Sequence, residues 1–348
     1  MRKMRHGAKE TVRAEVPNRI DLAGGTLDIY PLYLLVPGTV TVNAAIGVRS
    51  IVEIRRVRGA ARIVAEGVSR AREAGTTHRF PRGGPFGLAA AALRTYPALT
   101  GVEIRFRNEA PVGTGLGASS ALLVALMLAV ESWLGIRGSW EERANRGMEI
   151  EAMHLRNLTG RQDHIAALRG GIQGIRCGPG TTVAERISPA SREARIFERH
   201  AVLAFTGRSH FSAKVNWRMI RGAIEGNSEV LKKFGGIAGA ARDAWEAVAA
   251  GDMGRLGRAV WREWSLRKTV APGVSTRPVE ALLADREFHR RVSGAKLCGA
   301  GGGGMLFCLL RRPEEREALE SLLAGARFPA VPVRLSAGPK VSGVPRVR

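Results

Sequence analysis

The feature that most constrains this chain is a loop of alternating glycines that runs directly into a long apolar segment. Gly113, Gly115 and Gly117 occupy every second position, and the longest apolar run follows at 118–130. Such a loop exposes backbone N–H groups at a helix N-terminus, where anions bind well. The G-x-G-x-G spacing and the missing lysine exclude the dinucleotide and Walker A patterns, and "GASSA" is no nucleophile elbow. A phosphate cradle and a plain turn before a buried helix both stay open on this segment alone.

The length and composition set the scale of the fold. With 348 residues, 45% of them hydrophobic, the chain can bury the cores of two ordinary domains. Its three cysteines, Cys177, Cys298 and Cys308, lack CxxC spacing, which argues against a disulfide framework and a zinc site and suits a reducing cytosol. The basic start of the chain is followed by no signal-peptide core, and the apolar run is too short to span a bilayer. We therefore expect a cytoplasmic protein with no membrane partner.

The charge balance is strongly basic. Lys and Arg outnumber Asp and Glu by 54 to 31, a formal net charge of +23, which favours anionic partners such as nucleic acid, nucleotides or phosphorylated metabolites. The basic residues are scattered along the chain, and aromatic residues make up 5%. A single-strand nucleic-acid platform needs a basic groove interleaved with aromatic rings. The composition therefore argues against nucleic acid as the main ligand.

Strands and helices are expected in both halves of the chain. Four segments alternate or are rich in β-branched residues, which predicts strands at 10–25, 38–46, 48–57 and 101–113. The apolar run predicts a buried helix closed by Gly135, and 139–157 an amphipathic helix with Ser139 as its N-cap. Residues 178–199 show no clear period and mark the expected domain boundary, after which helical patterns dominate 213–295. This mixture predicts an α+β fold with mainly antiparallel pairing.

Three motifs, taken together, resemble those of one family. "PVGTGLGASSA" at 111–121 is similar to the second motif of the GHMP kinases, the family of galactokinase, homoserine kinase, mevalonate kinase and phosphomevalonate kinase. "VPNRIDLAGGTLDIY" at 16–30 is similar to the first motif, and "KLCGAGGGGMLF" at 296–307 to the third. Their order and spacing also agree with the family. Within it, the chain most resembles the D-glycero-D-manno-heptose 7-phosphate kinase branch of sugar kinases.

The resemblance implies both a fold and an activity. The fold is a two-domain GHMP kinase, with an N-terminal domain of mixed sheet and helices at 1–190 and a C-terminal α/β-plait-like domain at 191–348. The activity is transfer of phosphate from ATP, with Mg²⁺, to a sugar or sugar phosphate, heptose 7-phosphate first. Such transfer needs positioned phosphates, charge neutralisation and an oriented hydroxyl. The resemblance leaves open whether the protein forms a homodimer.

The resemblance assigns the glycine loop to the nucleotide. Ser119 falls where the family places a hydroxyl ligand to Mg²⁺ and phosphate, and Glu151 matches the glutamate that binds the metal. From the residues alone, Ser119 and Ser120 suit helix caps equally well, and Glu151 suits a solvated helix surface. The implied nucleotide-binding residues are Pro111, Gly113, Thr114, Gly115, Leu116, Gly117, Ala118, Ser119 and Ser120.

Two residues are implied to be catalytic. Asp163 in "GRQDH" matches the aspartate with which sugar and mevalonate kinases orient or deprotonate the acceptor hydroxyl. On the residues alone, Asp163 is an ordinary N-cap of the short helix that follows it. Arg19 takes the position of the basic residue of the first motif, where a cation would hold Asp163 ionised and offset charge on the transferring group.

The implied acceptor site departs from the family in one place. Asp28 lies nine residues after Arg19, where related sugar kinases bind sugar hydroxyls, but Leu27 stands where heptose kinases carry a threonine. This puts the identity of the sugar in question. The implied substrate-binding residues are Gly24, Gly25, Thr26, Asp28, Asp163, Gly301 and Gly302. If the acceptor already carries a phosphate, the candidate cations for it are Lys214, Arg267, Lys268 and Lys296.

Two alternatives stay open. One is a kinase of the same fold for a non-sugar alcohol such as mevalonate or homoserine, against which Asp28 argues. The other, from a different class, is a nucleic-acid-binding protein that keeps the fold without the activity, which the net charge of +23 motivates. The presence of Ser119, Glu151 and Asp163 together argues against this second alternative.

Overall fold

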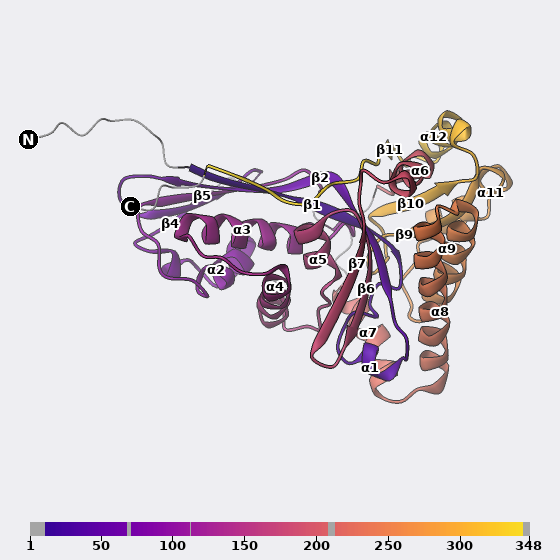
Figure 1. Cartoon of the computed structure of the whole chain (residues 1–348), viewed down its shortest axis with the longest axis horizontal. Helices are drawn as coiled ribbons and strands as arrows, with labels where there is room; N and C mark the ends of the chain where they lie inside the picture. Colours follow the sequence, from indigo (N-terminus) through magenta and orange to yellow (C-terminus); the bar gives the residue numbers. More distant parts are fainter. Residues whose placement is uncertain (1–10, 68–70, 112, 208–212, 344–348) are drawn as a thin grey trace, which may run out of the picture.

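The chain forms an elongated molecule built around two β-sheets. The computed structural model describes residues 11–67, 71–111, 113–207 and 213–343. The larger sheet and its helices α2 to α5 fill one end of the molecule, and the smaller sheet with α8 and α9 fills the other (Figure 1). This agrees with the expected α+β architecture.

The larger sheet has eight strands. Its strand order is β12-β1-β2-β5-β3-β4, and β6 continues it from β2 to β7. Its pairings are antiparallel except for β3 with β5. The strands are β1 (Thr11–Ala23), β2 (Thr41–Arg56), β3 (Ala61–Ala65), β4 (Arg72–Ala74), β5 (Val102–Asn108), β6 (Ile172–Gly178), β7 (Thr181–Ile187) and β12 (Lys340–Ser342). The pairing of β12 with β1 brings the end of the described chain back to the first sheet.

The helices on this sheet follow from their sequence patterns. Helix α3 contains the apolar run and ends at Gly135, which has φ 70° and caps the carbonyls of the last turn, as expected. Helix α4 begins at the predicted cap Ser139, in a capping box with Glu142. The helices that pack on this sheet are α2 (Gly87–Leu93), α3 (Ala118–Leu134), α4 (Trp140–Leu155) and α5 (Gln162–Arg169), with two 3-10 turns at Thr77–Arg79 and Gly84–Phe86. The short helix α1 (Leu32–Leu35) instead lies beside α7 (Ala213–Ile224), in the core of the other half (Figure 1).

The smaller sheet is antiparallel throughout, in the order β11-β8-β10-β9. Its strands are β8 (Ala201–Phe205), β9 (Val292–Leu297), β10 (Met305–Leu310) and β11 (Ala330–Val331). Its helices are α6 (Arg192–His200), α7 (Ala213–Ile224), α8 (Ser228–Ala250), α9 (Met253–Arg267), α10 (Arg277–Leu283), α11 (Arg286–Arg291) and α12 (Arg316–Gly325), with a 3-10 turn at Pro313–Glu315. Sheet and helices together give the expected plait-like half.

A shared apolar core joins the two halves. Ile20 of β1 and Val42 of β2 belong to the same buried cluster as Trp245 of α8 and Phe307 of β10. Each half also has a core of its own. The ends of β1 and β2 are therefore held against the second half, and the loop that follows β1 lies at the junction.

Two sequence expectations differ from the structure. Segments 38–46 and 48–57 are not two strands, because β2 runs through Gly47 without a turn. Residues 178–199 are not irregular, because they form most of β7 and α6. The division of domains at residue 190 stays a prediction. Among the described helices, none combines the length and apolarity needed to cross a membrane.

Candidate active site

A cavity of about 430 Å³ lies where the two halves meet. Its walls come from the end of β1, the N-terminus of α3, helices α4 and α5, and two glycine loops. We call residues 113–117 the first glycine loop and residues 299–304 the second. Since these segments are far apart in the sequence, only the tertiary fold forms the cavity.

The first glycine loop fits closely between its neighbours. A Cβ atom on Gly115 would lie 2.3 Å from the carbonyl oxygen of Cys298, and one on Gly117 would lie 2.9 Å from Oδ2 of Asp163. Both residues have positive φ, 76° and 69°. Any larger residue at these two positions would therefore collide with the second glycine loop or with Asp163.

The two glycine loops are also hydrogen-bonded to each other. The amide of Met305, just after the second loop, donates to the carbonyl of Thr114 at 2.9 Å. On its far side, the amide of Gly302 donates to the carbonyl of Val274 at 2.8 Å. The second loop is thus fixed beside the N-terminus of α3, where the helix dipole is positive.

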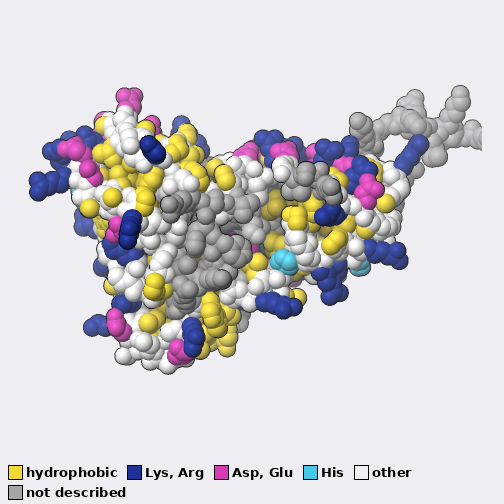
Figure 2. Space-filling view, turned by 180° about the vertical axis from the view of Figure 1, so that it is seen from behind, with side chains coloured by type: hydrophobic (Ala, Val, Ile, Leu, Met, Phe, Trp, Pro, Cys, Tyr) yellow, Lys and Arg dark blue, Asp and Glu magenta, His cyan; other side chains and the backbone are white. Residues whose placement is uncertain are grey.

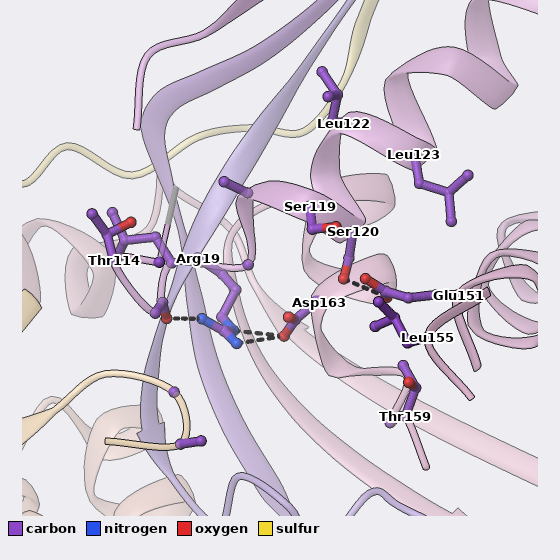
Figure 3. Close-up of a pocket in the computed structure, with 18 of the residues that line it drawn as sticks. Arg19, Thr114, Ser119, Ser120, Leu122, Leu123, Glu151, Leu155, Thr159 and Asp163 are labelled. Carbon is purple, nitrogen blue, oxygen red and sulfur yellow. Dashed lines mark hydrogen bonds and ion pairs between the residues drawn. The ribbon is translucent and has the colours of Figure 1, made fainter. Parts of the chain in front are cut away.

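Arg19 and Asp163 form an ion pair in the cavity (Figure 3). Nε and one terminal nitrogen of Arg19 lie 2.7 and 2.6 Å from Oδ1 of Asp163, and the other terminal nitrogen donates to the carbonyl of Gly115. Burial alone would lower the pKa of Arg19, but the carboxylates of Asp163 and Asp21 outweigh burial and raise it. Arg19 is therefore a permanent cation at the catalytic position that the sequence predicted.

Asp163 is not the N-cap of its helix. Arg161 takes that position, and Asp163 is the second residue of α5, in the first turn. Its side chain is 22% exposed and lines the cavity. The positive end of the α5 dipole and the Arg19 guanidinium both lie beside this carboxylate.

The hydroxyl that reaches Glu151 belongs to Ser120. Its Oγ donates to Oε2 of Glu151 at 2.7 Å, and Glu151 is 4% exposed, so it is no solvated surface residue. Ser119 is exposed on the cavity wall. Neither serine caps α3, since Gly117 is the N-cap and no side chain bonds there. Behind the pair, Nε2 of the buried His164 lies 3.4 Å from Oε2 of Glu151.

Asp28 also lines the cavity. It is 3% exposed, and its Oδ2 accepts a hydrogen bond from the amide of Gln162 at 2.8 Å. Its other oxygen is buried without a hydrogen-bond partner. Burial raises the pKa of Asp28 to about 6, against the opposing effect of the Gln162 hydrogen bond and with a further contribution from the charge of Asp163. This orphaned acceptor suits a ligand that brings hydroxyl donors.

The candidate cations for an acceptor phosphate have other partners. Arg267 bonds Glu263, Lys296 lies 3.0 Å from Asp21, and both cations are buried. Lys268 pairs with Glu280 in a second surface hollow. The side chain of Lys214 lies outside the described residues. Of the described residues that line the main cavity, Arg19 is the one cation.

Most of the predicted site residues meet in this one cavity. Pro111, Gly24 and Gly302 lie outside its lining, while the other predicted residues belong to it. Sequence reasoning missed its apolar end, which consists mainly of Phe86, Leu88, Phe106, Leu122, Leu126 and Leu155. The one signal for these residues is the four-residue spacing of Leu122 and Leu126, which places them on the same face of α3.

The described residues include no cluster of three or more His, Cys, Asp and Glu side chains suited to hold a metal ion. Glu151 with Ser119 or Ser120 offers one carboxylate and hydroxyl oxygens, all hard ligands. Such a partial set fits Mg²⁺, which usually takes its remaining ligands from phosphate and water.

Two family models match the chain, in order along it. The "GHMP kinases N terminal domain" matches residues 85–171, and the "GHMP kinases C terminal" model matches residues 244–327. Together they span both halves of the cavity, including Asp163 and both glycine loops.

Proteins with similar sequences carry the names of sugar kinases and of mevalonate kinases, such as the mevalonate kinase of Thermococcus onnurineus, which is 28% identical over 65% of this chain. A bifunctional fucokinase/GDP-fucose pyrophosphorylase of Arabidopsis thaliana is 24% identical over 339 residues, which is 89% of this chain and 31% of that protein. The D-glycero-alpha-D-manno-heptose 7-phosphate kinase of Campylobacter jejuni is 27% identical over 62% of this chain and 63% of its own length. The chain thus spans less than two thirds of each.

The fold is that of a solved sugar kinase structure. A D-glycero-D-manno-heptose 1-phosphate kinase from Bacteroides thetaiotaomicron superposes with a TM-score of 0.76 and 23% identity, covering 95% of this chain and 98% of that one. Both domain models and the two-sheet fold agree with the three motifs. Residues 85–171 and 244–327 are thus GHMP kinase N- and C-terminal domains.

Proposed function

We propose that this protein transfers the γ-phosphate of ATP to a hydroxyl group of a sugar or sugar phosphate. The observation that carries the proposal is the Arg19–Asp163 pair, which faces a cavity directly beside a glycine loop and a helix N-terminus. A carboxylate next to a phosphate-binding loop can accept the proton of an attacking hydroxyl. The names of the relatives, which are sugar kinases and mevalonate kinases, support the transfer of phosphate to a hydroxyl group.

Asp163 accepts the hydroxyl proton in this mechanism, and Arg19 has two tasks. Its guanidinium holds the carboxylate of Asp163 in place before the reaction and offsets negative charge on the phosphoryl group during transfer. Both tasks require a cation that never loses its proton, which the raised pKa of Arg19 provides. Gly117 brings the first glycine loop close enough for its amides to meet phosphate oxygens near Asp163.

Glu151 and the serines of α3 would hold Mg²⁺. Once bound with ATP, the ion would neutralise the phosphate charge. Ser120 already orients the Glu151 carboxylate from 2.7 Å, and the exposed Ser119 faces the space beside it (Figure 3). The protein contributes the orientation of these hard oxygen atoms, which the buried His164 behind Glu151 restricts further.

The apolar end of the cavity suits the base of the nucleotide. Phe86, Phe106 and Leu126 line it, and flat aromatic bases bind well between such side chains. Asn108 lines the same region, and its side-chain oxygen is buried without a hydrogen-bond partner. An exocyclic amino group such as that of adenine would satisfy this acceptor.

The opposite end, with Thr26 and Asp28, suits the acceptor. The unpaired oxygen of Asp28 favours a ligand with many hydroxyl groups, and a second carboxylate there, such as that of mevalonate, would be repelled when Asp28 is ionised, so a sugar is preferred to mevalonate. Among sugars, a heptose 7-phosphate remains the first candidate by resemblance. Unphosphorylated sugars such as fucose are further candidates, because three of the four cations considered for binding an acceptor phosphate are paired with other residues.

A substrate panel tests the proposal. Purified protein with ATP and Mg²⁺ is offered heptose 7-phosphate, free heptose, fucose, galactose, mevalonate and homoserine, and ADP release is measured against a no-acceptor blank. We expect ADP release with one or more of the sugars and none with mevalonate or homoserine. No release above the blank with any acceptor counts against the proposal.

Salt-sensitive RNA or DNA binding without nucleotide affinity would support the alternative of a nucleic-acid-binding protein. The face seen in Figure 2 shows Lys and Arg interspersed with Asp and Glu, which does not favour that alternative.

A further inference from the structure

Arg267 is a buried charge that touches the loop carrying Asp28. It is the last residue of α9 and 1% exposed. Its Nε donates to Oε1 of Glu263 at 2.6 Å, one terminal nitrogen donates to Oγ1 of Thr26 at 3.2 Å, and the other donates to the carbonyl of Gly25 at 2.5 Å. A residue from the second half of the chain is thus hydrogen-bonded to the loop at 24–28, which forms part of the cavity wall.

Arg267 is one end of a buried chain of four charges. The second oxygen of Glu263 lies 3.1 Å from Nζ of Lys296, and the same Nζ lies 3.0 Å from Oδ2 of Asp21. None of the four side chains is more than 1% exposed. Two cations and two carboxylates balance, which makes their burial tolerable. Asp21 precedes the loop at 24–28, so the chain of charges returns to the same loop from its other side.

The loop has a backbone conformation that its sequence does not favour. Thr26 has φ 79°, in the left-handed region, and the amide of Leu27 donates to the carbonyl of Gly24 at 3.1 Å. Thr26 is therefore the third residue of a tight turn, a position with positive φ that glycine usually fills. For a β-branched residue this conformation is strained and persists only where its surroundings impose it.

The strained residue determines where Asp28 lies. The amide of Ile29 donates to the carbonyl of Thr26 at 3.0 Å, so Asp28 is enclosed in the turn that Thr26 sets. The carboxylate of Asp28 accepts from the amide of Gln162, whose neighbour is Asp163. A different φ at Thr26 would move Asp28 relative to Asp163.

We propose that Arg267 is a positioning residue for the acceptor, which acts by holding Thr26 in its left-handed conformation so that Asp28 faces the cavity. Arg267 itself touches neither the reacting atoms nor the unpaired oxygen of Asp28. The kinetic part of this inference rests on the proposed kinase function. The structural part, the restraint of the loop at 24–28, does not.

The kinetic experiment compares Arg267→Lys with the wild type. Lysine keeps the charge beside Glu263 but cannot bond Thr26 and Gly25 together. We expect the KM for the acceptor to rise by about tenfold or more, with the KM for ATP nearly unchanged, because the hydrogen bonds to Thr26 and Gly25 are lost at the acceptor end alone. Arg262→Lys is the matched control, since Arg262 is on the same helix and pairs with Asp243 at the surface. An equal rise of both KM values overturns the proposal.

Substitutions at Thr26 separate strain from contact. Thr26→Gly removes the strain, so the double variant Arg267→Lys/Thr26→Gly should recover most of the loss in acceptor KM. Thr26→Val keeps the β-branch and removes the oxygen that Arg267 bonds, so it should resemble Arg267→Lys. If Thr26→Gly and Thr26→Val have the same effect, Arg267 does not act through the conformation of Thr26. These two variants also keep the buried charges intact, should Arg267→Lys fold poorly.

Hydrogen exchange gives a readout that needs no kinase activity. In Arg267→Lys, the amides of Leu27 and Ile29, which close the turn, should exchange at least several-fold faster, while those of α3 stay as in the wild type. Arg262→Lys should change neither set. Unchanged exchange at Leu27 and Ile29 in Arg267→Lys overturns the proposal even if the protein proves to be an active kinase. If no acceptor is phosphorylated in the substrate panel but these amides exchange faster in Arg267→Lys, the proposed function fails and the restraint of the loop by Arg267 is supported.

Discussion

Arg19 and Asp21 lie two residues apart on β1, on the same face of the strand, and both line the cavity, yet their ion pairs differ in exposure to solvent. The partner of Arg19 is Asp163, whose side chain is 22% exposed, whereas Asp21 and its partner Lys296 are 1% and 0% exposed. A partly exposed pair can exchange a partner for a ligand. A sealed pair cannot, because any change leaves an unpaired buried charge. The comparison suggests that the first pair performs chemistry and the second maintains the geometry around it.

The largest expected effect is at Asp163. Asp163→Asn keeps the shape of the side chain but removes the base and half of the ion pair with Arg19. We expect turnover to fall by about 10²–10⁴. Because the nucleotide would bind mainly to the glycine loops and the apolar end, ATP affinity should persist. Single-turnover kinetics and calorimetric titration with a non-hydrolysable ATP analogue measure the two quantities separately.

Asp243→Asn is the control for this variant, because Asp243 pairs with Arg255 and Arg262 at the surface. It should leave turnover unchanged. Near-normal turnover in Asp163→Asn would remove Asp163 from the mechanism and make its pair with Arg19 purely structural.

The sealed pair should respond in stability instead of turnover. Lys296→Met fills a similar space but leaves Asp21 and Glu263 without their shared cation. Breaking a buried pair in this way costs about 3–5 kcal/mol of unfolding free energy. Urea denaturation followed by circular dichroism measures the loss.

Lys268→Met provides the matched comparison, because Lys268 and Glu280 are 34% and 41% exposed. Exposed pairs contribute about 0–1 kcal/mol, so this variant should unfold almost like the wild type. If both lysine variants lose the same free energy, the sealed pair has no special structural role.

The sequence predicted the pocket-facing residues better than the sealed ones. Arg19, Asp163 and the first glycine loop fall at fixed positions in motifs, so resemblance to a family was enough to bring them together. Asp21 and Lys296 also lie inside the first and third motifs, but no motif pairs them with each other or with Glu263 and Arg267, and this pairing exists only once the two sheets have packed. Lys296 and Arg267 were two of the four candidates to meet an acceptor phosphate, and the structure pairs them with buried carboxylates.

Local patterns predicted helix ends better than strand ends. Ser139 and Gly135 were identified from capping chemistry, which depends on neighbouring residues alone. The division of β2 into two strands was wrong because a glycine inside a long strand looks like a turn when its partners on β1 and β6 are not known. The strand β7 within 178–199 was not predicted for a similar reason, since β7 is defined by its pairing with β6.

The titration of Asp28 gives a test with a smaller expected effect, in which the free energy of unfolding is measured as a function of pH. Its pKa of about 6 is above the value near 3.9 of an unfolded chain, so the folded state binds the proton more tightly. Protonation of Asp28 therefore removes a destabilising buried charge as the pH falls from about 6 to 4. Above pH 6, ionised Asp28 opposes folding by up to about 3 kcal/mol. Asp28→Asn should be more stable than the wild type at pH 7–8, and the difference should vanish near pH 4.

The same titration should appear in catalysis. The wild-type kcat/KM for the acceptor should fall as the pH drops through about 6, when the carboxylate loses one hydroxyl-binding lone pair to the proton. Asp28→Asn should have a low kcat/KM without that step. An unchanged pH step in Asp28→Asn would assign the titration to another group and weaken the case for Asp28 as the acceptor contact.

The smallest expected effect separates the two neighbouring serines of α3. Ser120→Ala removes the hydrogen bond that orients Glu151, and we expect the Mg²⁺ concentration for half-maximal activity to rise by about tenfold. Ser119→Ala leaves that bond intact, so it should act on the KM for ATP if Ser119 meets phosphate. Ser119→Ala improves helix propensity by about 0.5 kcal/mol, whereas Ser120→Ala also leaves the buried Glu151 without this donor, at a cost of about 1–3 kcal/mol. The Tm of both variants is therefore measured beside their activity. A change in Mg²⁺ dependence in Ser119→Ala alone would make Ser119, not Ser120, the hydroxyl that acts with Glu151.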